Sequence, residues 1–248
     1  MIKRNYYKIV RIFPDPSSYF YIKNETMSES EVGLFVFTPE MLNEMTLDYS
    51  FDKVNWTRVN ENNNNIHIPA DGYMYLRNTT GIFATNRTQV IVPNSDISLG
   101  GDIRTLFNYT DVESVTKIPD YGFSNPFAFQ NNSKCIDISN LSFRGITEIG
   151  NYGLKGAFGY NFTATKGVDL RDVTTLGEGA LNSLYSSNSK ITEVYAPNVS
   201  TWDENKTTWW LNSVASTGVL YKPSTLTIPT DSENGIPYGW TTQDYPTK

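Results

Sequence analysis

The sequence predicts a mostly β protein that consists of a β-sandwich followed by a short, irregular solenoid of repeats. We place the sandwich, of an Ig-like or jelly-roll-like kind, at residues 1–93 and the repeats at residues 94–248. The first prediction rests on short runs of β-branched and aromatic residues, separated by turn signals about every 8–12 residues. The second rests on one phrase that returns about every 25–32 residues, within or just beyond the spacing of leucine-rich repeats.

The composition of the chain argues against two classes of partner. Its 248 residues carry a net charge of −6, so the chain lacks the basic face with which nucleic-acid-binding proteins neutralise phosphates. An acidic chain is also not attracted to an anionic membrane surface, and no stretch approaches the ~20 apolar residues of a membrane span. We therefore expect no nucleic-acid partner and no membrane insertion.

Short strands are expected in the first part of the chain, bounded by Pro, Gly, Asn or Asp. They cover residues 6–13, 20–22, 31–38, 47–52, 54–59, 66–69, 73–77 and 87–93. Asp52-Lys53 should form a turn, Asp71-Gly72 a hairpin-type turn, and residues 39–45 one helical turn. Residues 1–22 either pack within this part or form an arm that pairs with another chain.

The repeats are preceded by an opening unit, in which Gly100-Gly101 is the expected turn and residues 102–107 a strand or short helix. The recurring phrase is an apolar-polar-apolar triplet, a turn, Ile or Leu before Gly, and small residues ending in Leu or Phe. It is found within residues 118–123, 135–138, 146–158, 168–170, 174–181, 191–197 and 218–223. A unit of this size cannot bury its own apolar face, so successive units must stack.

The C-terminal region is expected to close the stack. Trp210, Leu211 and Val214 have helical spacing, which predicts a helix or helical turn within residues 201–214. The aromatic end of the chain, which includes Tyr238 and Trp240, could cap the open apolar end that a solenoid leaves.

Two of the repeats resemble a known family. Residues 147–154 (Thr-Glu-Ile-Gly-Asn-Tyr-Gly-Leu) and 175–181 (Thr-Leu-Gly-Glu-Gly-Ala-Leu) are similar to BspA-like leucine-rich repeats, found on surfaces of gut Bacteroidota and in phages that infect them. Residues 218–241 resemble the way such arrays often finish, and residues 48–77 resemble the small β-sandwich that often precedes them. The resemblance covers most of residues 47–243.

This resemblance implies a surface or particle protein. The first residues of the chain lack the apolar run of an export signal, which a host adhesin would normally carry and a virion protein does not need. We therefore expect a non-enzymatic phage virion structural protein: a head fibre, a capsid decoration or a tail-associated component. Its partners would be other virion proteins and further copies of itself, with no cofactor. The alternative is a bacterial cell-surface adhesin or glycan-binding module that contacts a host surface glycan or protein.

Four aromatic residues near the C-terminus are candidate ligand-binding residues. Trp202, Trp209, Tyr238 and Trp240 could together form a platform for sugars. The alternative is that these side chains belong to the cap and to the core between repeats.

Side chains for nucleophilic catalysis are scarce. His67 is the one histidine, and the alternation of residues 66–68 predicts that it faces solvent. Cys135 is the one cysteine and is expected to be a small buried residue of the core. Neither a nucleophile with a histidine base nor a cluster of zinc ligands follows from this inventory, so we expect no enzyme.

Carboxylates leave one catalytic alternative. A glycosidase needs only a general acid and a second carboxylate, for which the candidate pairs are Asp111 with Glu113 and Glu148 with Asp169. The competing interpretation is a solvated acidic stripe across neighbouring triplets, formed by Asp137, Asp169 and Glu193, or a weak calcium site.

Overall fold

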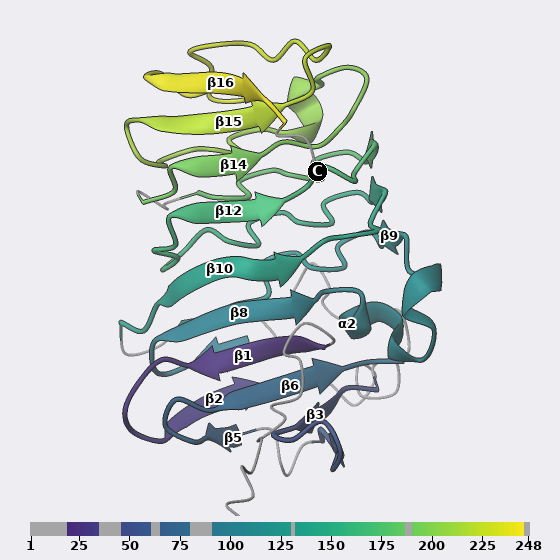
Figure 1. The fold of residues 1–248 in the computed structure, drawn as a ribbon, viewed down its shortest axis with the longest axis vertical. Helices are drawn as coiled ribbons and strands as arrows, with labels where there is room; N and C mark the ends of the chain where they lie inside the picture. The colour runs from purple at the N-terminus through teal and green to yellow at the C-terminus, as the bar shows by residue number, and fades with distance from the viewer. Residues whose placement is uncertain are drawn as a thin grey trace, which may run out of the picture.

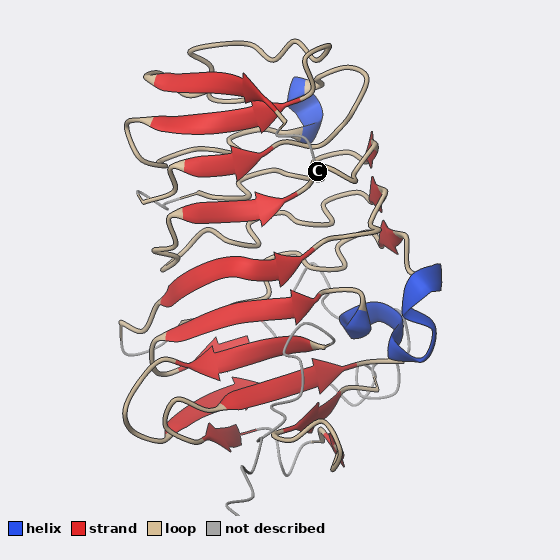
Figure 2. Ribbon diagram, viewed as in Figure 1, coloured by secondary structure: helices blue, strands red, loops and turns tan. Residues whose placement is uncertain are grey.

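The computed structural model describes residues 19–34, 46–60, 65–79, 91–129, 132–186 and 190–245. Strands make up 33% of the structure and helices 7%, which confirms the mostly β prediction. Figures 1 and 2 show the strands piled along the long axis of the molecule, with the few helical segments at one side. The predicted strand 6–13 and helical turn 39–45 lie outside the described residues.

Short strands follow one another along the whole described part of the chain. In chain order they are β1 (Phe20–Asn24), β2 (Ser30–Leu34), β3 (Asp48–Ser50), β4 (Thr57–Arg58), β5 (Asn65–Ile68), β6 (Tyr73–Arg77), β7 (Ile91–Pro93), β8 (Ile97–Asp102), β9 (Lys117–Ile118), β10 (Cys135–Ser142), β11 (Glu148–Ile149), β12 (Lys166–Asp169), β13 (Thr175–Leu176), β14 (Glu193–Tyr195), β15 (Gly218–Lys222) and β16 (Trp240–Asp244). The helices are α2 (Thr105–Asn108) and the 3-10 helices η2 (Tyr109–Ser114) and η3 (Glu204–Lys206). Within the described ranges, no helix has the length and apolar character needed to cross a membrane.

A six-stranded sheet in the order β10-β8-β1-β6-β3-β4 contains β1 near its centre. β1 pairs antiparallel with both β6 and β8, and Phe20 and Ile22 point into the core with no exposed surface. Residues 20–22 are therefore part of this chain's own sheet and not of an arm that reaches another chain. Residues 1–18 lie outside the described part.

A second sheet, in the order β5-β2-β7, contributes to the same core. Ile66 and Ile68 of β5 are buried and His67 between them is exposed, which confirms the predicted alternation. The turn at Asp71-Gly72 is also present, since Asp71 has the positive φ of 50° that such turns require. It does not form a hairpin, however, because β5 and β6 belong to different sheets.

The predicted turn at Gly100-Gly101 is wrong, because both glycines lie inside β8. The hydroxyl of Tyr21 packs over Gly100 and would collide with a Cβ atom there. Gly101 has a φ of 79° and faces the carbonyl of Tyr19 across the sheet. The two glycines permit this close approach of β1 to β8, so they serve the packing of the two strands and not a turn.

Beyond β8, strands recur in two columns (Figure 1). One column contains β12, β14, β15 and β16, which pair in parallel, and the other contains the short parallel strands β9, β11 and β13. The N–H of Asn151 donates to Asp120, 31 residues earlier, and the N–H of Glu178 donates to Asn151, 27 residues earlier. The recurring phrase thus combines two kinds of strand, one from each column.

The sheet is continuous across the predicted domain boundary at residue 93. β8 is bonded antiparallel to β1 on one side and parallel to β10 on the other. Buried residues from both parts form one core cluster. Within it, the rings of Phe20 and Phe123 pack edge to face, with their centroids 6.2 Å apart. The two predicted parts therefore share a sheet and a core.

The long column is interrupted between β10 and β12. No ladder joins these two strands in the described residues. Cys135 of β10 instead forms an isolated bridge with Phe162, which lies before β12. Within β12 the N–H of Val168 turns inward and donates to the hydroxyl of Tyr185 at 2.9 Å. Tyr185 is fully buried, so its hydroxyl satisfies a backbone group that a neighbouring strand would otherwise bond.

The region 201–214 is more irregular than predicted. Its helical part is the single 3-10 turn η3, and residues 208–213 form further turns. Trp210 is fully buried and its Nε1 donates to the carbonyl of Gly235 at 2.8 Å. This contact ties the region to the segment that leads into β16.

We predict that Tyr185→Phe lowers the free energy of unfolding by about 1–3 kcal/mol, because it leaves the buried N–H of Val168 without a partner. Urea unfolding would measure the change. Tyr160→Phe is the matched control, since Tyr160 is 78% exposed and its hydroxyl can be replaced by water. Equal stability of the two variants would contradict the role given to Tyr185.

We also predict a loss of stability at alkaline pH that depends on Tyr21. Burial, and to a lesser degree the nearby Tyr73, raises the pKa of Tyr21 to about 12. The folded protein therefore holds this proton more tightly than the unfolded chain, whose tyrosine pKa is about 10. The free energy of unfolding should fall as the pH rises from 10 to 12. In Tyr21→Phe, denaturation followed over this range should show a shallower fall, and an unchanged slope would refute the assignment.

Candidate functional site

A hollow of about 520 Å³ opens where β10 and β12 diverge, and it is the candidate site. Its lining comes from the carboxyl ends of the two strands and from the loops that follow them. The lining residues are Ser139, Asn140, Leu141, Ser142, Phe143, Arg144, Asp169, Arg171 and Asp172. The side chains of Leu141 and Phe143 are buried in the core, so the exposed lining is polar and charged.

An ion pair fixes the β12 side of the hollow. The guanidinium of Arg171 forms three hydrogen bonds with Asp169, two from Nε at 2.9 and 3.0 Å and one from Nη2 at 2.6 Å. These bonds raise the pKa of the Arg171 guanidinium. The same guanidinium lies over the ring of Tyr195, 4.8 Å from its centroid. Arg171 is thus paired and held in place within the protein.

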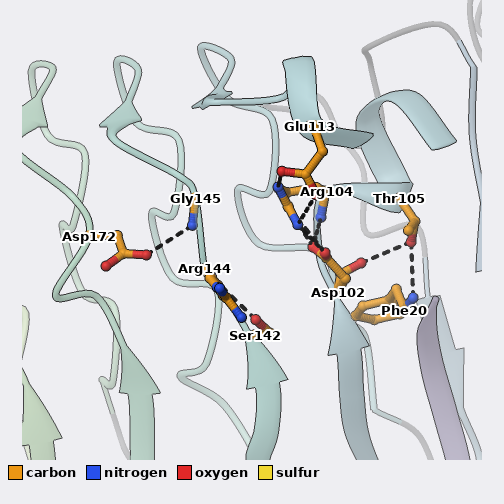
Figure 3. A network of polar contacts seen from close by, with 9 residues as sticks. All are labelled: Phe20, Asp102, Arg104, Thr105, Glu113, Ser142, Arg144, Gly145 and Asp172. Carbon is orange, nitrogen blue, oxygen red and sulfur yellow. Dashed lines mark hydrogen bonds and ion pairs between the residues drawn. The ribbon is translucent and has the colours of Figure 1, made fainter. Parts of the chain in front are cut away.

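Backbone contacts fix the loop after β10. The N–H of Arg144 donates to the Ser142 hydroxyl at 3.2 Å, and the N–H of Gly145 donates to Asp172 at 3.0 Å. Figure 3 shows both bonds, the second of which joins this loop to the loop after β12. The positive φ of Gly145, 82°, allows the loop to turn at this point.

A polar network lies beside the hollow, at the end of β8 (Figure 3). Arg104 pairs with Asp102 at 2.8 Å and with Glu113 at 3.2 Å. The hydroxyl of Thr105 accepts the N–H of Phe20 at 2.9 Å and donates to the carbonyl of Asp102. This network joins β1, β8 and the 3-10 helix η2, and so it supports the strand next to β10.

An aromatic row continues from the hollow along the outer side of the long column. Tyr195 of β14 and Tyr221 of β15 are level with one another, and their rings stack at 4.6 Å with 12° between the planes. Tyr245, after β16, lies 5.9 Å from Arg171 and donates its hydroxyl to the carbonyl of Ala196. Burial raises the pKa of both Tyr195 and Tyr245.

Two of the four predicted ligand-binding aromatics are packed into the molecule. Trp240 is buried and its Nε1 donates to the carbonyl of Ala215 at 2.7 Å. Trp202 is half-buried against the core, and its Nε1 donates to the carbonyl of Asn234 at 2.8 Å. These two side chains hold the C-terminal region together.

The other two predicted aromatics are on the surface. Trp209 is 48% exposed and Tyr238 is 84% exposed, and the Nε1 of Trp209 donates to Glu233 at 2.8 Å. No ring contact joins Trp209 to Tyr238 in the part of the chain that the structure describes. They offer separate exposed rings.

The structure does not bring the carboxylates of Glu148 and Asp169 together. Glu148 belongs to the short column and lies 2.5 Å from the Lys117 ammonium, whereas Asp169 belongs to the long column and pairs with Arg171. This candidate pair does not form because its two members belong to different columns of strands.

The other predicted pair, Asp111 with Glu113, lies in the 3-10 helix η2 and does not line the hollow. The carboxylate of Glu113 pairs with Arg104 beside the end of β8. Its position supports a role in the network around Arg104.

The predicted acidic stripe is also wrong. The pairing of β12 with β14 shifts between Lys166 and Asp169, so that Lys166 lies level with Glu193 and Asp169 level with Tyr195. Lys166 and Glu193 consequently form an ion pair at 3.5 Å. Strict alternation cannot reveal such a shift, because a bulge changes which residues are neighbours.

Cys135 is confirmed as a buried core residue, and burial raises the pKa of its thiol well above the usual value. Such a thiol is a poor nucleophile. Within the described residues, no group of three or more His, Cys, Asp and Glu side chains is arranged to hold a metal ion.

Sequence reasoning missed the arginines of the site. Asp102-Ile103-Arg104 ends β8, and Asp169-Leu170-Arg171 ends β12. In both, the Arg N–H donates to the Asp carboxylate two residues earlier, at 3.0 Å. An Arg that recurs two residues after the last polar residue of a long strand is the signal that would have identified them.

Comparison with known proteins gives no relative: no family model, no curated protein and no solved structure matches the chain.

For the aromatic candidates we predict that Trp210→Ala lowers the free energy of unfolding by about 3–5 kcal/mol, because it empties a fully buried site. Trp209→Ala is the matched neighbour and should cost less than about 1 kcal/mol, since half of its ring is in water. Chemical denaturation of both variants tests the assignment, which a larger loss for Trp209→Ala would reverse.

Proposed function

We propose that this chain is a non-enzymatic structural and binding protein of a phage particle, built from a sandwich-like part and a leucine-rich-repeat-like solenoid of the BspA kind. The observation that best supports the proposal is the regular contact between successive repeats. Thr147 donates its N–H and hydroxyl to the carbonyl of Thr116, 31 residues earlier, and the Thr174 hydroxyl donates to the carbonyl of Thr147, 27 residues earlier. Repeats bonded in this way give a rigid scaffold with an extended face.

The sandwich-like interpretation is supported by the packing of two sheets around one core. Ile66 and Ile68 of β5 belong to the same cluster as Ile22 of β1 and Met74 of β6. The side chains of β5 alternate between core and solvent, as is typical of a strand in a sandwich.

Docking to other proteins would use exposed outer strands of the sheets. In the described residues, β4 and β16 are each one of the two outer strands of their sheet, and each is bonded on one side. Thr57 and Arg58 of β4 and residues 241–244 of β16 are exposed. Outer strands of this kind can accept a strand from a partner or from another copy of the chain.

The location on a phage particle rests on the resemblance of residues 147–154 and 175–181 to repeats found in Bacteroidota and their phages. The second candidate function is a bacterial cell-surface adhesin or glycan-binding module. The polar hollow between β10 and β12 favours a binding role in either location.

The location is tested by quantitative mass spectrometry of purified particles and of the envelope fraction from the same culture. We predict that the chain is present in particles at a fixed ratio to the major capsid protein. Its absence from particles together with enrichment in envelopes would refute the virion assignment and support the adhesin.

A further inference from the structure

The arginine of one repeat lacks the partner that its counterparts have. In the unit that ends β8, Arg104 is paired with Asp102, and in the unit that ends β12, Arg171 is paired with Asp169. Each pair forms two or more hydrogen bonds between the guanidinium and the carboxylate. Both arginines are therefore neutralised within their own repeat.

The unit that ends β10 has the same backbone arrangement but a different side chain. Ser142 is level with Asp102 in the parallel pairing of β10 with β8, and its hydroxyl accepts the N–H of Arg144 at 3.2 Å. Serine occupies the place of the carboxylate, and no carboxylate within the described part of the chain lies at ion-pair distance from Arg144. Arg144 is exposed and lines the hollow.

The two carboxylates of the hollow have partners within the chain. Asp169 binds Arg171, and Asp172 accepts the N–H of Gly145. Of the two guanidinium groups of the hollow, Arg171 has an ion pair and Arg144 has none within the described residues, and an arginine fork fits a carboxylate. The hollow thus offers a ligand the position that an aspartate carboxylate fills in the repeats on either side.

The remaining lining indicates what kind of molecule carries the carboxylate. Ser139, Asn140 and Ser142 present hydroxyl and amide groups, which bond to hydroxyls, while the apolar side chains of the lining are buried. The volume of about 520 Å³ lies within the range of small-molecule sites. The stacked rings of Tyr195 and Tyr221 lie beyond Arg171 and give further surface to a longer ligand.

We propose that the hollow between β10 and β12 binds a carboxylate-bearing saccharide, and that Arg144 pairs with its carboxylate. This inference rests on the binding role proposed above and names the site and the ligand class. It does not depend on where the protein is located, so the mass-spectrometric result and the binding result can fail independently.

The test is a titration of the ¹⁵N-labelled full chain with glucuronate, glucose and acetate, followed through the backbone amides of residues 139–145. We expect glucuronate to shift these amides at a lower concentration than acetate, and glucose to bind most weakly. Arg144→Ala should weaken glucuronate binding about tenfold or more, since it removes a charge-assisted hydrogen bond. Arg144→Lys should retain part of the affinity, because it keeps the charge and loses the fork.

Ser142→Asp is the sharpest variant. It restores the carboxylate that the neighbouring repeats have two residues before their arginine, so that Arg144 becomes paired within the chain and glucuronate binding is lost. Lys134→Ala removes a positive charge from an exposed side chain outside the hollow and should leave the affinity unchanged. The proposal is overturned if glucuronate leaves the amides unshifted, if acetate or glucose binds as well as glucuronate, or if Ser142→Asp binds like the unaltered chain.

Discussion

Backbone bonding between successive repeats is the constraint on which the second half of the molecule depends. Each repeat places its N–H groups against carbonyls and side-chain oxygens of the repeat before it, as Asn151 does with Asp120. The approach is close: a Cβ atom on Gly177 would lie 2.6 Å from the backbone nitrogen of Asn151. Glycine is therefore needed where successive turns stack closely. Differences in length between repeats must be accommodated outside these close contacts.

The candidate site exists because this bonding fails at one place. β10 is bonded to β8, and β12 to β14, but no ladder joins β10 to β12 in the described residues, and Cys135 of β10 is bridged to Phe162, which lies before β12. Unbonded strand edges are costly unless water or side chains reach them. At this break the hydroxyl of Tyr185 takes the N–H of Val168 on the core side, and polar residues line the outer side as a hollow. The buried hydrogen bond of Tyr185 and the hollow therefore both arise from the missing ladder between β10 and β12.

Local patterns predicted the fold well where burial decides the structure. The alternation around His67 depends only on near neighbours in the sequence. The sequence could not reveal pairings that depend on distant strands. The shift that sets Asp169 beside Tyr195, and the contact of Tyr21 with Gly100, arise only when the strands are side by side. That is why the acidic stripe and the glycine turn were wrong.

The arginines illustrate the same limit for the site. The recurrence of Arg104, Arg144 and Arg171 is visible in the sequence, yet their equivalence is hidden by the segment between β8 and β10, which contains α2, η2 and β9. Once the strand ends are aligned, one serine in place of an aspartate distinguishes the middle repeat. A guanidinium that is already paired would have to give up its carboxylate to bind a ligand, whereas Arg144 has no such ion pair to break within the described residues. Selective binding at this repeat therefore follows from the loss of a partner and needs no change in the backbone.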